Sequence, residues 1–213
     1  MPVPDLWLAA CILAGGFAGW TAGRAARLLA SGITASWKLE AALVLAGAAL
    51  SAWAWAVTPE GLVLVASLAL AFCLLTLAAV DIAVFRLPDL ITLPLTAAGL
   101  LLAWALPAAD GFLGHLAGSL VGYGVLALTA WGFRRFRGVD GIGMGDAKLM
   151  AAAGAWLGWQ ALPSVLLLGC GGGLLWWSVG RMLRSQEPRI PFGAPLCAAI
   201  WLVWLHGPLQ FAL

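Results

Sequence analysis

Long apolar stretches, separated by short polar connections, follow one another along the whole chain. A membrane-spanning helix needs about 20 apolar residues, and eight stretches approach or reach that length. The sixth is short, and only a Trp-Gln-Ala-Leu-Pro connection separates it from the seventh, so this boundary is the least defined. The pattern predicts an all-α, polytopic transmembrane helix bundle of about eight spans. The predicted spans are residues 6–28, 39–57, 61–80, 90–107, 112–133, 147–160, 161–182 and 192–211.

The basic residues give an independent check on the number of spans. Lys and Arg gather in the cytoplasmic loops of membrane proteins. With eight spans, all 11 of them fall in or beside odd-numbered connections, and the even-numbered connections carry none. This parity predicts that odd-numbered connections face the cytoplasm and that both termini lie outside. The basic positions are Arg24, Arg27, Lys38, Arg86, Arg134, Arg135, Arg137, Lys148, Arg181, Arg184 and Arg189.

The composition excludes an ordinary soluble domain. Apolar residues make up 63% of the chain and charged residues 9%, with a mean hydropathy of +1.01, far from the usual soluble range. No linker or soluble domain is visible, so we expect one membrane-embedded domain over residues 1–213. Because the first residues carry no basic cluster, the first apolar stretch is expected to be a retained helix and not a cleaved signal peptide.

The four cysteines, Cys11, Cys73, Cys170 and Cys197, lie inside apolar stretches without a CxxC motif or a Cys/His cluster. Metal sites and disulfide frameworks need such clustering, so we predict no metal, and we interpret the cysteines as packing residues. The basic run at 134–137 resembles a nucleic-acid patch, but beside a membrane span it is first a topology signal. We therefore predict a lipid-embedded protein that binds no nucleic acid.

Two aspartates stand out because ionisable side chains are costly inside a membrane and usually functional there. Asp81 follows the almost wholly apolar stretch 61–80, and Asp146 opens the sixth predicted helix. A predicted helical hairpin separates them and returns the chain to the same membrane face. The two carboxyls can therefore converge just inside the cytoplasmic boundary. Six other acids are expected in loops or near basic residues: Asp5, Glu40, Glu60, Asp110, Asp140 and Glu187.

Such a pair of carboxyl groups suits aspartic proteolysis. Two like charges a few ångströms apart cannot both ionise, so the pair retains one proton near neutral pH. The ionised member can then activate a water as general base, while the protonated member polarises the scissile carbonyl. Neither a metal nor a covalent nucleophile is required.

Glycines at 141, 143 and 145 lead into Asp146. They remove side chains where a backbone turns tightly or approaches another chain, and a peptide substrate could pair with such bare backbone by strand addition. The alternative is a flexible glycine-rich loop in which Asp146 caps the sixth helix. For Asp81 alone, an interfacial helix end without catalytic function is the corresponding alternative.

Other polar residues receive structural interpretations. Asp89 follows a proline and precedes an apolar stretch, which predicts a helix N-cap; Asp89→Asn is then expected to retain activity. Lys148 is interpreted as a membrane anchor, since it does not share a helical face with Asp146. His115 and His206 are placed on the outer halves of their helices, too far from the two aspartates to act as a base.

At these residues the sequence resembles the type IV prepilin peptidase family, which belongs to the GxGD class of intramembrane aspartic peptidases. Residues 81–95, DIAVFRLPDLITLPL, look like the first aspartate segment of that family, and residues 143–149, GMGDAKL, look like the second. The similarity continues in GAWLGW at 154–159 and IPFG at 190–193, so it covers about residues 60–200. Two motifs in the correct order make the resemblance specific.

The resemblance implies an inner-membrane aspartic endopeptidase that works without a cofactor. It would remove the short basic leader of prepilin or pseudopilin precursors on the cytoplasmic side, for assembly of a pilus or a type II secretion system. Asp81 and Asp146 take the catalytic roles. Gly143, Gly145, Pro191 and Gly193 are expected to bind substrate or shape loops.

One departure from the family concerns the first cytoplasmic connection. Many bacterial members carry a larger insert there, with paired CxxC motifs that bind zinc and accompany N-methylation of the cleaved pilin. Here the connection is short, about residues 24–38, and has no cysteine. N-methyltransferase activity is therefore not expected. The alternatives to a peptidase are a non-catalytic assembly factor and a proton-coupled carrier that uses the same aspartates as relay groups.

Overall fold

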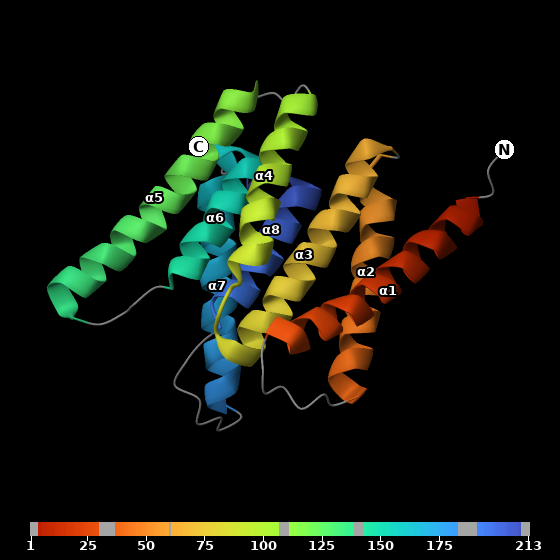
Figure 1. Cartoon of the computed structure of the whole chain (residues 1–213), viewed down its shortest axis with the longest axis horizontal. Helices are drawn as coiled ribbons and strands as arrows, with labels where there is room; N and C mark the ends of the chain where they lie inside the picture. Colours follow the sequence, from red (N-terminus) through yellow and green to blue (C-terminus); the bar gives the residue numbers. More distant parts are fainter. Residues whose placement is uncertain are drawn as a thin grey trace. The chain divides into compact units, whose positions relative to one another are not determined.

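The regular structure of the chain is helical wherever the structure, a computed structural model, describes it. Figure 1 labels these helices in chain order. They divide into two compact units, Met1–Val84 and Phe85–Leu213, and each unit is described by itself. The predicted all-α fold is confirmed, whereas the single domain over residues 1–213 stays a prediction. The described residues are 4–29, 37–59, 61–106, 111–138, 143–182 and 191–209.

The first unit holds the helices α1 (Pro4–Leu29), α2 (Trp37–Val57) and α3 (Leu62–Val84). Glycines let α1 and α2 approach backbone to backbone. A Cβ atom added at Gly19 would lie 2.1 Å from the carbonyl oxygen of Leu43. Close approach through small residues is a common way of packing helices where lipid removes the hydrophobic driving force.

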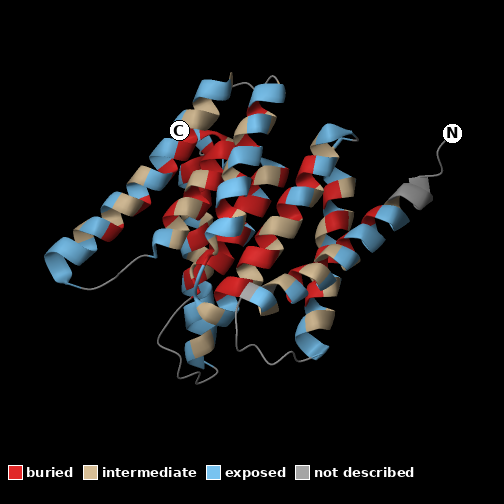
Figure 2. Cartoon of the chain, viewed as in Figure 1, coloured by how far each residue is buried: buried red, intermediate tan, exposed pale blue. Residues whose placement is uncertain are grey.

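The second unit is organised around one short, buried helix, α6. It contacts α4, α5, α7 and α8, so neighbouring helices surround it. Figure 2 colours most of α6 as buried, in agreement with the burial of eight of its residues. The helices of this unit are α4 (Asp89–Ala105), α5 (Gly111–Arg137), α6 (Met144–Leu157), the 3-10 turn η1 (Trp159–Ala161), α7 (Leu162–Met182) and α8 (Gly193–His206).

Glycines also set the separation of α5 and α6. A Cβ atom added at Gly154 of α6 would lie 2.1 Å from the backbone of Gly118 on α5. One helical turn along α5, a Cβ atom at Gly122 would lie 2.5 Å from the carbonyl oxygen of Met150. No real Cβ atom tolerates such distances from backbone atoms, so the two helices can pack this closely only with glycine at these positions.

A tryptophan joins α6 to α4. Trp156 is buried, and its indole Nε1 donates a hydrogen bond of 2.8 Å to the carbonyl oxygen of Leu95. The ring lies against Gly99, where an added Cβ atom would come within 2.5 Å of Trp156 Cδ1. A buried N–H group needs a partner in an apolar environment, and the α4 backbone provides one.

The helices differ in how well they match a bilayer. Among the residues that the structure describes, four helical segments are long and apolar enough to cross a membrane by length and composition: α2, α3, α5, and η1 together with α7. The 14 residues of α6 and of α8 extend only about 21 Å at 1.5 Å per residue, against about 30 Å of hydrocarbon. The chain is thus a multi-pass membrane protein. That eight of its segments cross the whole bilayer stays a prediction.

Helix ends follow backbone chemistry more closely than hydropathy. The predicted segment 147–160 corresponds to α6, which ends at Leu157 because Gly158 adopts a φ of +79°. The predicted segment 112–133 is extended to Arg137 in α5. Arginine is a good helix former and is favoured near a helix C-terminus, so α5 continues past the predicted apolar stretch through the basic run to Arg137.

Candidate active site

Asp81 lies in the last turn of α3, as predicted. Its side chain is buried, with 5% exposed, and the helix ends three residues later at Val84. Phe85 follows with a φ of +54°, a left-handed conformation that does not continue an α-helix and that non-glycine residues rarely adopt. Among the described candidate spans α3 has the highest mean hydropathy, and its last turn carries a buried carboxyl group.

Asp146 lies in the first turn of α6. Gly143 occupies the N-cap position, and its carbonyl oxygen accepts a hydrogen bond of 3.1 Å from the backbone N–H of Asp146. The alternative in which Asp146 itself caps the helix does not hold, since Asp146 is the third residue of the helix. A Cβ atom at Gly143 would lie 3.2 Å from Oδ2 of Asp146. The glycine therefore leaves room for the carboxylate to fold back over the start of the helix.

Gly145 allows a close approach, and it is not part of the flexible loop that the alternative interpretation predicts. It lies inside the first turn of α6, where an added Cβ atom would come within 2.9 Å of the Leu87 side chain. Neither Gly143 nor Gly145 adopts a positive φ. Close packing against Leu87 therefore explains Gly145, and the room needed by the Asp146 carboxylate explains Gly143. Gly141 lies outside the described residues.

Pro191 and Gly193 lie at the start of α8, and both are buried. Phe192 between them is the N-cap residue, and its carbonyl oxygen accepts a hydrogen bond of 3.1 Å from the N–H of Leu196. The two residues thus shape a helix start in the same unit as Asp146. Their expected contact with substrate stays a prediction.

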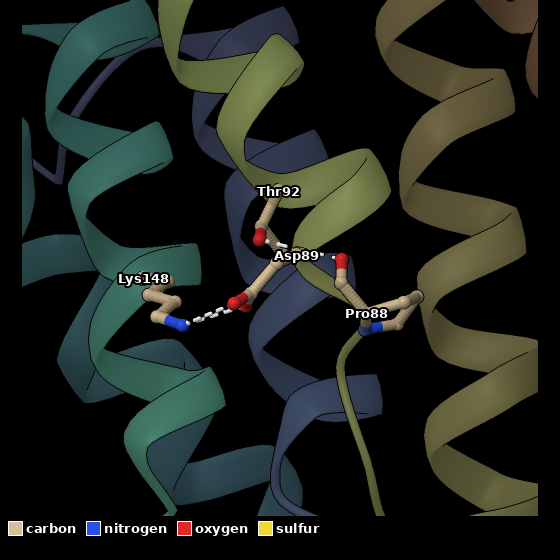
Figure 3. Close-up of polar contacts among 4 residues, drawn as sticks. All are labelled: Pro88, Asp89, Thr92 and Lys148. Atoms are coloured by element: carbon tan, nitrogen blue, oxygen red, sulfur yellow. Dashed lines mark hydrogen bonds and ion pairs between the residues drawn. The ribbon is translucent and has the colours of Figure 1, made fainter.

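Asp89 and Lys148 form an ion pair that the sequence analysis missed. The Lys148 ammonium on α6 lies 2.6 Å from each carboxylate oxygen of Asp89, at the start of α4 (Figure 3). The prediction that Asp89 is a helix cap is wrong: Pro88 occupies that position, and no side chain caps the helix. A detectable signal was the opposite charge of two residues predicted at helix starts on the same membrane face.

The Pro88 carbonyl begins the hydrogen bonding of α4. It accepts hydrogen bonds from the N–H groups of Ile91 and Thr92 and from the Thr92 hydroxyl. Figure 3 shows the Asp89 carboxylate turned away from these groups and toward Lys148. The carboxylate of Asp89 thus serves a contact between helices.

His115 lies at the opposite end of α6 from Asp146. Its Nδ1 is 3.0 Å from the carbonyl oxygen of Ala155, in the last turn of α6. Ala155 follows Asp146 by nine residues, which is about 13 Å along a helix axis. The predicted separation of His115 from Asp146 is confirmed.

The predicted site residues are divided between the two units. Asp81 belongs to the first, whereas Asp146, Gly143, Gly145, Pro191 and Gly193 belong to the second. The convergence of the two aspartates stays a prediction. Within the described ranges, no three His, Cys, Asp or Glu side chains group as metal ligands, and all four cysteines are free.

Comparison with known proteins decides the family. The model of the type IV leader peptidase family matches residues 68–178, a stretch that includes both Asp81 and Asp146. The Escherichia coli (strain K12) prepilin leader peptidase/N-methyltransferase is 39% identical over 160 residues, which are 74% of this chain and 70% of that protein. The chain belongs to the type IV leader peptidase family. The resemblance identified from the two aspartate motifs is confirmed.

Other members of the leader peptidase family are similarly close. Proteins of the same name from Aeromonas salmonicida (strain A449) and Burkholderia pseudomallei (strain K96243) are 43% and 44% identical over 148 and 160 residues. These matches cover 67% and 72% of this chain but 49% and 50% of the relatives. The chain thus spans about half the length of these curated relatives. No solved structure matches it.

Proposed function

We propose that this protein is a prepilin leader peptidase of the bacterial inner membrane. It would cut the short basic leader from prepilin or pseudopilin precursors on the cytoplasmic side, before the apolar pilin helix. The observation that carries the proposal is the family match, which covers both aspartate motifs. Relatives named prepilin leader peptidase/N-methyltransferase add support. A match to peptidases favours this function over a carrier or a non-catalytic assembly factor.

In the proposed mechanism Asp81 and Asp146 share one proton and act on one water. One carboxylate takes a proton from the water as it attacks the scissile carbonyl. The other carboxyl protonates the carbonyl oxygen, and the tetrahedral intermediate then collapses with proton transfer to the leaving amine. The scheme needs no group beyond these two side chains and the water.

The two helix ends suggest which aspartate takes which role. Asp146 lies in the first turn of α6, where the unpaired N–H groups stabilise negative charge. Asp81 lies in the last turn of α3, where the unpaired C=O groups of the helix C-terminus disfavour a negative charge. We therefore assign the general base to Asp146 and the general acid to Asp81.

The proposal is tested by incubating the purified protein, in lipid, with a set of pilin-like precursors and measuring product masses. We expect loss of the basic leader from at least one precursor, with a new N-terminus directly after a glycine. Unchanged masses for all precursors, with protein that is folded and inserted, would reject the peptidase function. A precursor whose cleavage-site glycine is replaced by a bulky residue is the matched substrate control.

The same assay tests the expected lack of methylation. A methyl donor pocket typically encloses several hundred cubic ångströms, and a connection of about 15 residues without cysteines cannot build one alone. With S-adenosylmethionine present, we expect the mature pilin to lose its leader without gaining a methyl group. A quantitative methyl increment would show that the remaining cytoplasmic connections suffice for methyl transfer.

Cleavage on the cytoplasmic side requires the orientation that the basic residues predict. Reporter fusions at Ser31, Arg137 and Gln186 are expected to report the cytoplasm, and fusions at Thr58 and Ala109 the outside. Each position is fused in turn to a reporter active only in the cytoplasm and to one active only outside. An outside signal at Arg137 would place the second motif on the wrong face for a prepilin leader.

A further inference from the structure

The contacts around Asp146 tie the beginning of α6 to the beginning of α4. Immediately before Asp146, Gly145 packs against Leu87, with 2.9 Å between its ideal Cβ position and the Leu87 Cβ. Two residues after Asp146, Lys148 contacts both carboxylate oxygens of Asp89 at 2.6 Å. Residues three apart in a helix share a face. Gly145 and Lys148 therefore present one face of α6 to residues 87–89.

This anchored face fixes the direction of the Asp146 side chain. Asp146 follows Gly145 by about 100° around a helix of 3.6 residues per turn, so it projects away from the face that meets residues 87–89. A rotation or an axial shift of α6 against α4 would break the Lys148 contact and move the Asp146 carboxyl together with it. The ion pair thus restrains the rotation and the axial position of the first turn of α6 against α4.

Both charges suit this pairing. Asp89 lies in the first turn of α4, where the helix dipole favours an anion. Lys148 lies near the start of α6, where the same dipole disfavours a cation and so increases its need for a carboxylate. The side chains are 54% and 29% exposed, respectively. Exposed ion pairs contribute little to folding, so a geometric function explains this pair better than a contribution to stability.

The other end of α6 has anchors of its own. Gly154 packs against Gly118 of α5, and Trp156 donates its hydrogen bond to Leu95 of α4. These contacts lie two to three turns from Asp146 and secure α6 in the unit. Loss of the ion pair would therefore loosen the first turn while leaving the rest of α6 in place.

We propose that Asp89 and Lys148 form a positioning pair that holds the first turn of α6, and with it the Asp146 carboxyl, in the geometry needed for cleavage. This inference rests on the proposed peptidase function. Asp89 and Lys148 act through Asp146 and are positioning residues. The expectation that Asp89→Asn retains activity, which assumed a helix cap, is replaced by a loss of activity.

The test measures kcat and KM of leader cleavage for Asp89→Asn, Lys148→Gln and the double variant. We expect each single change to lower kcat by about 10- to 100-fold, the size of effect that a misplaced catalytic group produces, with KM nearly unchanged. Because the two residues act on one contact, the kcat of the double variant should be no lower than that of the less active single variant. Losses that multiply, or singles that cleave like wild type, would overturn the proposal.

A charge-swapped protein, Asp89→Lys with Lys148→Asp, separates positioning from a general need for either residue. We expect its kcat to be about tenfold or more above that of the less active single variant, because the ion pair is restored with its charges exchanged. No recovery, in protein with the thermal stability of wild type, would overturn the proposal. Arg137→Gln removes an exposed charge at the end of α5 and should leave kcat unchanged. Failure of the wild-type protein to cleave any precursor would instead reject the peptidase function itself.

Discussion

Asp81→Asn and Asp146→Asn are each expected to lower the rate of leader cleavage by about 10³-fold or more, within the range that general acid–base catalysis contributes. Each substitution removes one half of the proposed acid–base pair and leaves side-chain volume almost unchanged. Because the two carboxyls share one proton, the double variant should be no slower than either single variant. The measurement is single-turnover cleavage of a prepilin, followed by product mass.

Controls separate lost chemistry from lost folding. Both variants should insert into the membrane and melt at temperatures close to wild type. Asp110→Asn makes the same change in a connection predicted to lie outside, and it should cleave normally. An Asp81→Asn protein that cleaves at the wild-type rate would contradict the assignment, and it would make Asp89 the candidate for the first catalytic aspartate. A loss for Asp89→Asn limited to about 10- to 100-fold fits positioning instead.

Gly154→Ala is expected to destabilise the protein strongly although it adds one methyl group. Its new Cβ would lie 2.1 Å from the Gly118 backbone, which cannot move aside as a flexible side chain can. Overpacking of this kind typically costs about 1–3 kcal/mol. Separation of α5 from α6 should also displace Asp146, so that cleavage falls together with the melting temperature in detergent.

A matched pair of glycines on α5 tests the same contact from the other side. Gly122→Ala places a Cβ 2.5 Å from the carbonyl oxygen of Met150, whereas Gly124→Ala, two residues further along, meets nothing within 4 Å. We expect the first change to lower the melting temperature and the second to leave it unchanged or raise it, because alanine favours helix over glycine. Equal effects would mean that helix propensity, and not close packing, governs these positions.

The sequence alone determined the helical class, the family and the two helix ends that carry aspartates. Apolar stretches and the placement of basic residues are local signals, and they located α3 and α6 to within a few residues of their observed bounds. The motifs at Asp81 and Asp146 identified the family because the residue types and their order are written directly in the chain. Hydropathy failed mainly at helix ends, such as Gly158, where backbone conformation decides.

Only the tertiary structure decided what the residues around Asp146 contact. Asp89 and Lys148 are 59 residues apart, and each has a sound local interpretation, as a helix cap and as a membrane anchor. The glycine before Asp146 likewise has a local interpretation as a flexible turn, yet it lies in a helix against Leu87. Helical periodicity states which residues share a face, but not which neighbouring helix that face meets. That choice depends on the packing of α4, α5 and α6 against one another, where glycines set how closely the backbones approach.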